Sequence, residues 1–174
     1  MAALRKRLLP AIALALATPL AAQEAEPAPF LSTPEAALQA AQDCAAATSR
    51  VGVSEDELVL RGWERAKNVD AIADPAEIDA LPIRFYTKGG ENPLIFRRLA
   101  TPEEKRQCVV SGQVEDADAY RDMVLAFTNA FGPPTSTSDS GTMIFSSFPH
   151  AIALTRKRDE NSAVFVVLVL ESGE

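Results

Sequence analysis

Residues 116–134 read DADAYRDMVLAFTNAFGPP, and this stretch decides the fold that the sequence predicts. Gly132 followed by two prolines is typical of a helix end. The residues before it repeat an apolar side chain every three or four positions, as on one face of a helix. These apolar residues are Tyr120, Met123, Val124, Phe127, Ala130 and Phe131. We therefore predict a long helix from about 116 to 131, whose apolar face packs on a sheet.

Strands are predicted on both sides of this helix. Alternating apolar residues favour a β-hairpin over 83–99 and a third strand over 107–114. After the helix, two short strands are expected over 142–147 and 150–156. The last stretch, AVFVVLVL at 163–170, is apolar at every position, which predicts a central strand buried on both faces of the sheet.

Two helices are predicted before the first strand. Thr33 is suited to be the N-cap of a helix that begins with Pro34 and runs to about Thr48. Ser54 and Glu57 are spaced as a capping box at the start of a second helix. The apolar side of this second helix comprises Leu58, Val59, Gly62, Trp63 and Ala66. The order ααβββαβββ predicts a single α+β domain over 34–171, with an antiparallel sheet of five or six strands packed against the long helix.

The N-terminal 22 residues have the pattern of a secretory signal peptide. Three basic residues at 5–7 precede an apolar run over 8–20, and small residues follow it. That run contains two prolines and is shorter than the ~20 residues of a membrane-spanning helix. We expect cleavage near Ala22, a flexible leader over 23–33, no stable membrane anchor, and delivery to the periplasm or the extracellular space.

The net charge of the chain argues against two classes of partner. The whole chain has a net charge of −7, and residues 23–174, with 14 basic and 24 acidic residues, have a net charge of −10. Nucleic acids and anionic membrane surfaces attract clustered positive charge. We therefore expect neither as a partner, and expect instead an unidentified protein or small ligand of the cell envelope.

The chain contains two cysteines, Cys44 and Cys108. An even number of cysteines in an exported chain favours a disulfide over free thiols, and two cysteines allow one pairing. A redox-active pair would instead need close spacing in the sequence or a neighbouring base, which the sequence does not display. We therefore predict a structural Cys44–Cys108 disulfide.

Seven basic residues are grouped at three places in the sequence. If the two three-stranded blocks bring their ends together, these residues form one basic edge that could bind an anionic ligand or an acidic partner. Charges at strand edges and turns also protect sheets against aggregation, and we favour this second interpretation. The candidate basic edge comprises Arg97, Arg98, Lys105, Arg106, Arg156, Lys157 and Arg158.

The sequence displays no motif for catalysis, for a metal or for a cofactor, and we predict none of the three. His150 is the only histidine, so any catalytic triad or histidine-containing metal site must use it. Zinc needs three or four ligands, more than one histidine and two distant cysteines supply. The acidic residues over 115–122 lack the glycine and final glutamate of a calcium loop and fit the start of a helix. A catalytic carboxylate pair is positioned by the fold, so the sequence leaves it open.

The layout of residues 34–170 resembles that of small exported, disulfide-stapled proteins of proteobacteria to which no activity is assigned. The likeness lies in Gly62-Trp63 at the end of a helix and in a Gly132-Pro133 stop before the last three strands. The resemblance implies an exported α+β domain and no particular chemistry.

Three functions are compatible with these observations. We expect an exported, periplasmic and non-catalytic binding or accessory protein. One alternative is a small exported hydrolase that uses His150 or a carboxylate pair. Another is an acidic inhibitor or immunity-type protein, which its charge would steer to basic targets and which would present an acidic and apolar surface patch.

Overall fold

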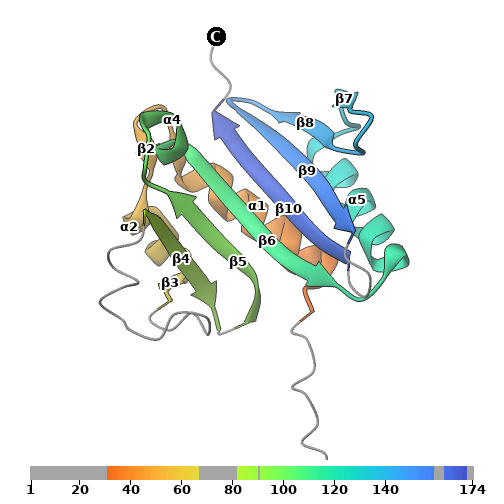
Figure 1. Ribbon diagram of the computed structural model, residues 1–174, viewed down its shortest axis with the longest axis horizontal. Helices are drawn as coiled ribbons and strands as arrows, with labels where there is room; N and C mark the ends of the chain where they lie inside the picture. Colours follow the sequence, from red (N-terminus) through yellow and green to blue (C-terminus); the bar gives the residue numbers. More distant parts are fainter. Residues whose placement is uncertain (1–30, 67–81, 90, 159–162, 172–174) are drawn as a thin grey trace, which may run out of the picture.

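A computed structural model describes residues 31–66, 82–89, 91–158 and 163–171 (Figure 1). Eight of their strands form one antiparallel sheet in the order β3-β4-β5-β6-β10-β9-β8-β7. The strands are β3 Glu64–Arg65, β4 Ile83–Lys88, β5 Glu91–Arg98, β6 Gln107–Val114, β7 Ser136–Thr137, β8 Met143–Ser147, β9 His150–Arg158 and β10 Ala163–Glu171. The predicted α+β class is confirmed. The predicted number of five or six strands is wrong because β3 and β7 add two-residue edge strands, which are too short to display alternation.

The sheet is built from two halves with the same connectivity. In one half, helix α1 (Pro34–Ala47) precedes the strands β4, β5 and β6. In the other half, helix α5 (Ala117–Phe131) precedes β8, β9 and β10. The last strands of the two halves, β6 and β10, pair with each other along eight residues at the centre of the sheet. In each half, the three long strands therefore follow one another in chain order from the outer side of the sheet to its centre.

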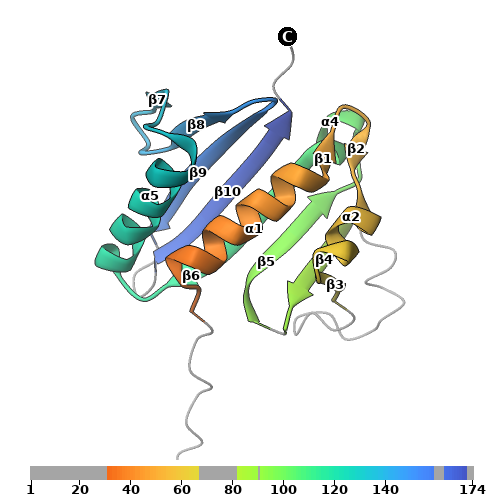
Figure 2. The same ribbon diagram turned by 180° about the vertical axis from the view of Figure 1, so that it is seen from behind.

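Helices α1 and α5 both lie on one face of the sheet (Figure 2). Thr33 is the N-cap of α1, as predicted, and its Oγ1 accepts a hydrogen bond from the N–H of Ala36 at 3.1 Å. Asp116 is the N-cap of α5, and the helix ends at Gly132, which has a φ of +84°. This positive φ is a conformation that glycine adopts without steric strain. The predicted long helix and its stop are therefore confirmed.

The second predicted helix is shorter than expected. Helix α2 covers Glu55–Leu60, and Ser54 Oγ accepts a hydrogen bond from the N–H of Glu57 at 3.2 Å. Gly62, at a φ of +85°, ends the helix, and the N–H of Trp63 donates to the carbonyl of Leu58 at 3.0 Å. The prediction that the helical face continues through Trp63 and Ala66 is therefore wrong, because the chain has turned into β3 there.

Further short elements were not predicted. A small hairpin of β1 (Thr48–Ser49) and β2 (Gly52–Val53) follows α1 directly. Helix α4 (Pro102–Lys105) joins β5 to β6, and its N-cap Thr101 forms a complete capping box. Each of these elements is four residues long or less, which is below the length at which hydrophobic periodicity becomes informative.

The N-terminal segment enters the fold beside β6. The N–H of Ser32 donates to the carbonyl of Gln113 at 2.7 Å, and Ser32 is buried. The last residues of the predicted leader are thus fixed to the sheet. The predicted signal peptide and residues 23–30 lie outside the described residues. No helix in the described part of the chain is both long and apolar enough to cross a membrane.

The core lies between the sheet and the two long helices. Alanines at 37, 40, 41 and 47 form the buried side of α1, and such small side chains let the helix approach the sheet closely. Gly112 of β6 leaves room for the side chains of Ser32 and Phe165, because a Cβ there would lie 2.5 Å from Ser32 Oγ and 2.8 Å from Phe165 Cε1. The largest fully buried side chains of this core are Tyr86, Phe127, Phe145, Phe165, Leu58 and Ile95.

Strand β10 differs in burial between its two faces. Phe165, Val167 and Val169 point to the helices and are fully buried, whereas the residues between them are partly exposed. The prediction of a central strand is confirmed, since β10 pairs with β6 and β9. The prediction that it is buried on both faces is wrong, because α1 and α5 lie on the same face.

Candidate functional site

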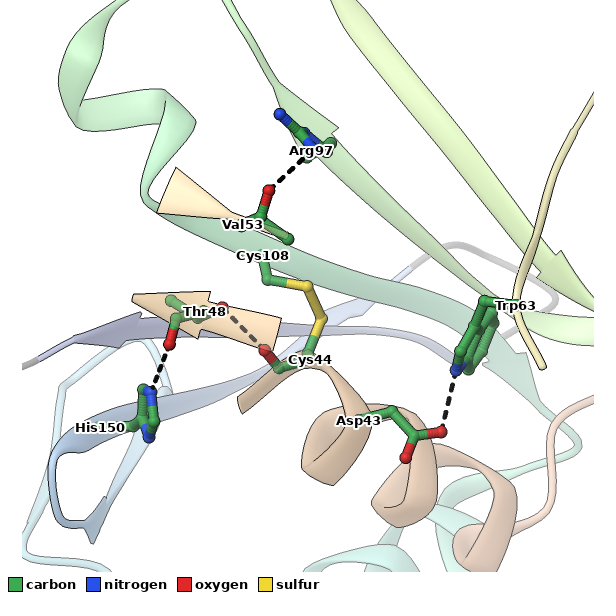
Figure 3. Close-up of a disulfide and its surroundings, with 8 residues drawn as sticks. All are labelled: Asp43, Cys44, Thr48, Val53, Trp63, Arg97, Cys108 and His150. Atoms are coloured by element: carbon green, nitrogen blue, oxygen red, sulfur yellow. Dashed lines mark hydrogen bonds between the residues drawn. A yellow bond between two sulfur atoms is a disulfide. The ribbon is translucent and has the colours of Figure 1, made fainter. Parts of the chain in front are cut away.

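Cys44 and Cys108 form the predicted disulfide (Figure 3), with their Cα atoms 5.6 Å apart. Cys44 lies in the last turn of α1, and Cys108 is the second residue of β6. Both residues are 0% exposed. A thiolate that attacks a disulfide must reach a sulfur atom, so the burial of this bridge favours a structural role. The bridge fixes α1 to the centre of the sheet.

Asp43, next to the disulfide, is a buried carboxylate that sequence reasoning missed. Its side chain is 2% exposed, and it accepts a hydrogen bond from Trp63 Nε1 at 2.9 Å (Figure 3). It accepts another from Gln39 Nε2 at 3.0 Å. Arg61 and Lys88 bring positively charged groups to 3.5 Å and 3.4 Å of its oxygens. A buried carboxylate with this many partners is satisfied rather than reactive. The network fixes α1, the end of α2 and β4 relative to one another.

His150, the first residue of β9, is partly buried. Its Nε2 lies 3.0 Å from the carbonyl oxygen of Thr48 (Figure 3). Because a carbonyl oxygen only accepts, Nε2 is the donor in this hydrogen bond. Strand register places Ser147 on one side of His150 and Glu171 on the other. Among these described residues, no hydrogen bond joins the side chain of Ser147 or Glu171 to the imidazole, and Glu171 pairs with Arg50 at 3.4 Å.

The acidic residues over 115–122 surround the start of α5. Asp116 Oδ1 accepts hydrogen bonds from the N–H groups of Asp118 and Ala119, both at 2.8 Å. This is the helix-start role that their position predicts. In the ranges that the structure describes, no group of three or more His, Cys, Asp or Glu side chains is arranged to hold a metal ion.

The residues of the candidate basic edge at 97 and 98 lie on opposite faces of β5. Arg97 is on the face of the helices, and its guanidinium donates to the carbonyl of Val53 at 2.8 Å (Figure 3). Arg98 pairs with Glu104 of α4 at 2.9 Å. Lys105 and Arg106, at the end of α4, are exposed.

The basic residues of β9 lie elsewhere in the sheet. The guanidinium of Arg156 lies 5.5 Å from the centroid of the Tyr120 ring. Arg156 pairs with Phe165 of β10 in the strand register. Arg97 is in register, through Cys108, with Val169, which lies four positions further along β10. Arg97 and Arg156 are therefore not side by side. The side chains of Lys157 and Arg158 lie outside the described residues.

Burial raises the pKa of two tyrosines on the face of the helices. Burial raises the pKa of Tyr86, the nearby carboxylate of Glu55 raises it further, and Arg97 opposes both effects. Burial also raises the pKa of Tyr120, and the positive charge of Arg156 partly opposes this. Both phenols stay protonated at neutral pH, so neither is an activated base.

The face of the sheet opposite α1 and α5, which we call the open face, is apolar across six strands. Figure 1 views the sheet from this side. Strand register aligns one row of side chains from β4 to β8: Phe85, Phe96, Val109, Leu168, Ala153 and Ile144. The flanking rows add Leu94, Val164, Val166, Leu170 and Ala151. Most of these side chains are partly exposed, although Val109, between Phe96 and Leu168, is 6% exposed.

From β4 to β8 the open face carries no acidic residue among its described positions, whereas Glu64 of the edge strand β3, which pairs with Thr87, lies on this face at its margin. Arg98 lies at its margin, and the polar residues within it are small or uncharged, such as Ser111 and Thr155. Sequence reasoning missed this surface because an apolar run in a strand predicts burial and does not reveal which face lacks a covering helix. One sequence signal could have indicated this surface: in the alternating pattern of the hairpin over 83–99, Phe85 and Phe96 fall on the same face of the sheet.

Comparison of the chain with models of known protein families, with curated proteins and with solved structures returned no match. Function is therefore inferred from the residues of this chain and their geometry. Two arrangements are chemically informative: the open face, and the row of Ser147, His150 and Glu171.

Proposed function

We propose that this protein is an exported, non-catalytic binding protein whose docking surface is the open face, and that this face takes a protein partner with an apolar surface. The observation that carries the proposal is the row from Phe85 to Ile144, which is uncharged across six strands in a chain with 24% charged residues. Contiguous exposed apolar patches larger than a few hundred Å² are rare on monomers and mark interaction sites.

The dimensions of the open face suit a protein partner. Six strands about 4.8 Å apart and a strand length of about 20 Å give roughly 500 Å² of sheet surface. This area is larger than a small ligand covers and approaches one side of a small protein interface. Nucleic acids and anionic membranes are poor candidates, because both prefer clustered Lys and Arg.

Two observations support export. The Cys44–Cys108 disulfide fits an oxidising compartment, since disulfides persist mainly outside the cytosol. The pattern of residues 1–22 is that of a signal peptide. We therefore place the binding function in the periplasm.

Site-specific photocrosslinking in the envelope of the native host tests this proposal. A photoreactive residue replaces Leu168 at the centre of the open face, or Leu125, an exposed residue of α5, as the matched control. We expect an adduct with a protein at 168 and none at 125. The identified protein should bind the purified chain, and Val166→Glu should weaken that binding at least tenfold. Equal labelling at the two positions would overturn the proposal.

A hydrolase that uses His150 is the second candidate function. The observation that favours it is the row of Ser147, His150 and Glu171, which brings a hydroxyl, an imidazole and a carboxylate to one end of the sheet. Against it stand the engagement of Nε2 by Thr48 and of Glu171 by Arg50. Turnover of an ester or amide panel that both Ser147→Ala and His150→Gln abolish, with unchanged unfolding midpoints, would establish it. An inactive protein excludes it for those substrates.

The inhibitor or immunity-type alternative receives no support from the open face. Such a protein was expected to present an acidic and apolar patch. From β4 to β8, the described positions of the open face are apolar without being acidic.

A further inference from the structure

We infer that the partner of the open face is a second copy of this chain, and that the two faces pack together as a sandwich with a two-fold axis parallel to the strands. This inference rests on the proposed function, because it names the occupant of the same surface. Sheets that pack face to face bury the side chains between them in a layer about 10 Å thick.

Aromatic rings and alanines occupy opposite sides of the open face. Strands β4 and β5 carry Phe85 and Phe96, whose ring centroids lie 6.1 Å apart. Strand β9, on the other side of the centre, carries Ala151 and Ala153. The open face thus has the partly exposed rings of β4 and β5 on one side, and on the other side the alanines of β9 followed by Ile144 of β8.

This division makes the open face complementary to itself. A two-fold axis parallel to the strands and midway between the sheets superposes β5 of one copy on β9 of the other, because it reverses the order of the strands. Phe96 then lies over Ala153 of the second copy, and Val109 lies over Leu168, since these residues belong to one row. The same contacts occur twice, as in any isologous interface. An axis perpendicular to the strands would instead place phenylalanine over phenylalanine.

Charge also favours this surface for self-association. Two copies of a chain with a net charge of −7 repel each other, and burying a carboxylate without a partner is costly. From β4 to β8, the described positions of the open face bury no carboxylate when two copies meet there, and Glu64 lies outside these strands, on the edge strand β3. The exposed carboxylates of Asp118 and Asp122 belong to α5, on the opposite face of the sheet, and stay in contact with solvent.

The area sets the expected strength of the dimer. Roughly 500 Å² from each copy gives about 1,000 Å² in total, which is near the lower limit for a specific interface. We therefore expect a dissociation constant on the order of micromolar rather than nanomolar. A dimer of this strength forms at the concentrations used in sedimentation experiments.

Sedimentation equilibrium of the purified, disulfide-intact protein tests the inference. We expect a reversible monomer–dimer equilibrium for the wild type. Phe96→Ala removes the partly exposed ring, and Ala153→Phe fills the side of the alanines, so each should weaken the dimer at least tenfold. The double variant exchanges the two shapes and should restore most of the affinity. Leu125→Ala, on the exposed side of α5, is the matched control and should leave the dimer unchanged. Unfolding midpoints verify that every variant is folded.

The outcomes separate this inference from the proposed function. A wild type that stays monomeric, or a dimer unaffected by Phe96→Ala and Ala153→Phe, overturns the inference. The crosslink at Leu168 then decides the broader proposal: an adduct with a different protein upholds the docking surface with another partner. An adduct that joins two residues of a single molecule, or no adduct above the Leu125 control, overturns both the dimer and the docking surface.

Discussion

Replacing both cysteines with alanine is expected to lower the free energy of unfolding by about 4 kcal/mol. The disulfide joins residues that are 64 positions apart. Closing a loop of that length removes about 4 kcal/mol of conformational entropy from the unfolded chain at 25 °C. Alanine is preferable to serine, because a hydroxyl at either fully buried position would add about 1–3 kcal/mol for an unsatisfied polar group. Since small domains are stable by about 5–15 kcal/mol, this loss leaves a narrow margin.

Urea unfolding of three samples measures this effect: the oxidised wild type, the wild type in reductant, and Cys44→Ala/Cys108→Ala. The reduced wild type is the matched control, because it loses the cross-link and keeps every side chain. We expect the reduced protein and the double variant to unfold at similar urea concentrations, both well below the oxidised protein. The slope of the transition should increase without the cross-link, because the unfolded chain exposes more surface. A double variant as stable as the oxidised wild type would refute the reasoning.

Three further predictions concern the core. Asp43→Asn should lower the free energy of unfolding by about 1–3 kcal/mol, because it weakens charge-assisted hydrogen bonds to a buried group; urea unfolding measures it. Gly112→Ala should cost about 1–3 kcal/mol in the same assay, because the added Cβ overlaps Ser32 and Phe165. Burial raises the pKa of Tyr86 and Tyr120 above the ordinary value of 10.0, so the folded state retains these protons when the unfolded state has lost them. Their contribution to the free energy of unfolding should therefore be constant below pH 10 and fall as the pH rises above it, which urea unfolding at a series of alkaline pH values measures.

Neighbouring residues provide the controls for these variants. Asp122→Asn removes an exposed charge on α5, and Ser111→Ala changes the residue before Gly112 on the other face of β6, so both should stay within ~0.5 kcal/mol of the wild type. Tyr120→Phe should reduce the fall in stability above pH 10. If Asp43→Asn or Gly112→Ala is as stable as its control, the packing described around that residue is wrong. An unchanged pH dependence in Tyr120→Phe would assign the effect to another group.

The elements that the sequence predicted are those with a long periodic pattern and a chemical stop. Helix α5 has four turns of apolar spacing followed by Gly132, and the β4–β5 hairpin alternates on both sides of a glycine turn. Helix α2 was predicted too long, because Trp63 continues the three-and-four spacing beyond Gly62. Helical spacing cannot reveal that Gly62 has a positive φ, which ends the helix.

The candidate site was less predictable because it depends on contacts between distant residues. The Cys44–Cys108 pairing could be predicted, since two cysteines allow one bridge. Two of the partners of Asp43, Trp63 and Lys88, lie 20 and 45 residues away along the chain, and no spacing rule connects them to it. The open face could not be predicted from β10 alone, because it depends on α1 and α5 sharing one face of the sheet.

The position of β10 determines when the sheet can be completed. This strand is the last of the described elements along the chain, yet it lies at the centre, between β6 and β9. A polypeptide that emerges N-terminus first must hold both neighbouring strand edges without a partner until residues 163–171 arrive. Unpaired edges accept strands from other molecules, so the incomplete chain is the species most exposed to misassembly. A stop codon just before Ala163 would therefore remove a central strand of the sheet and leave β6 and β9 unpaired on that side, whereas loss of an edge strand would leave the remaining strands paired.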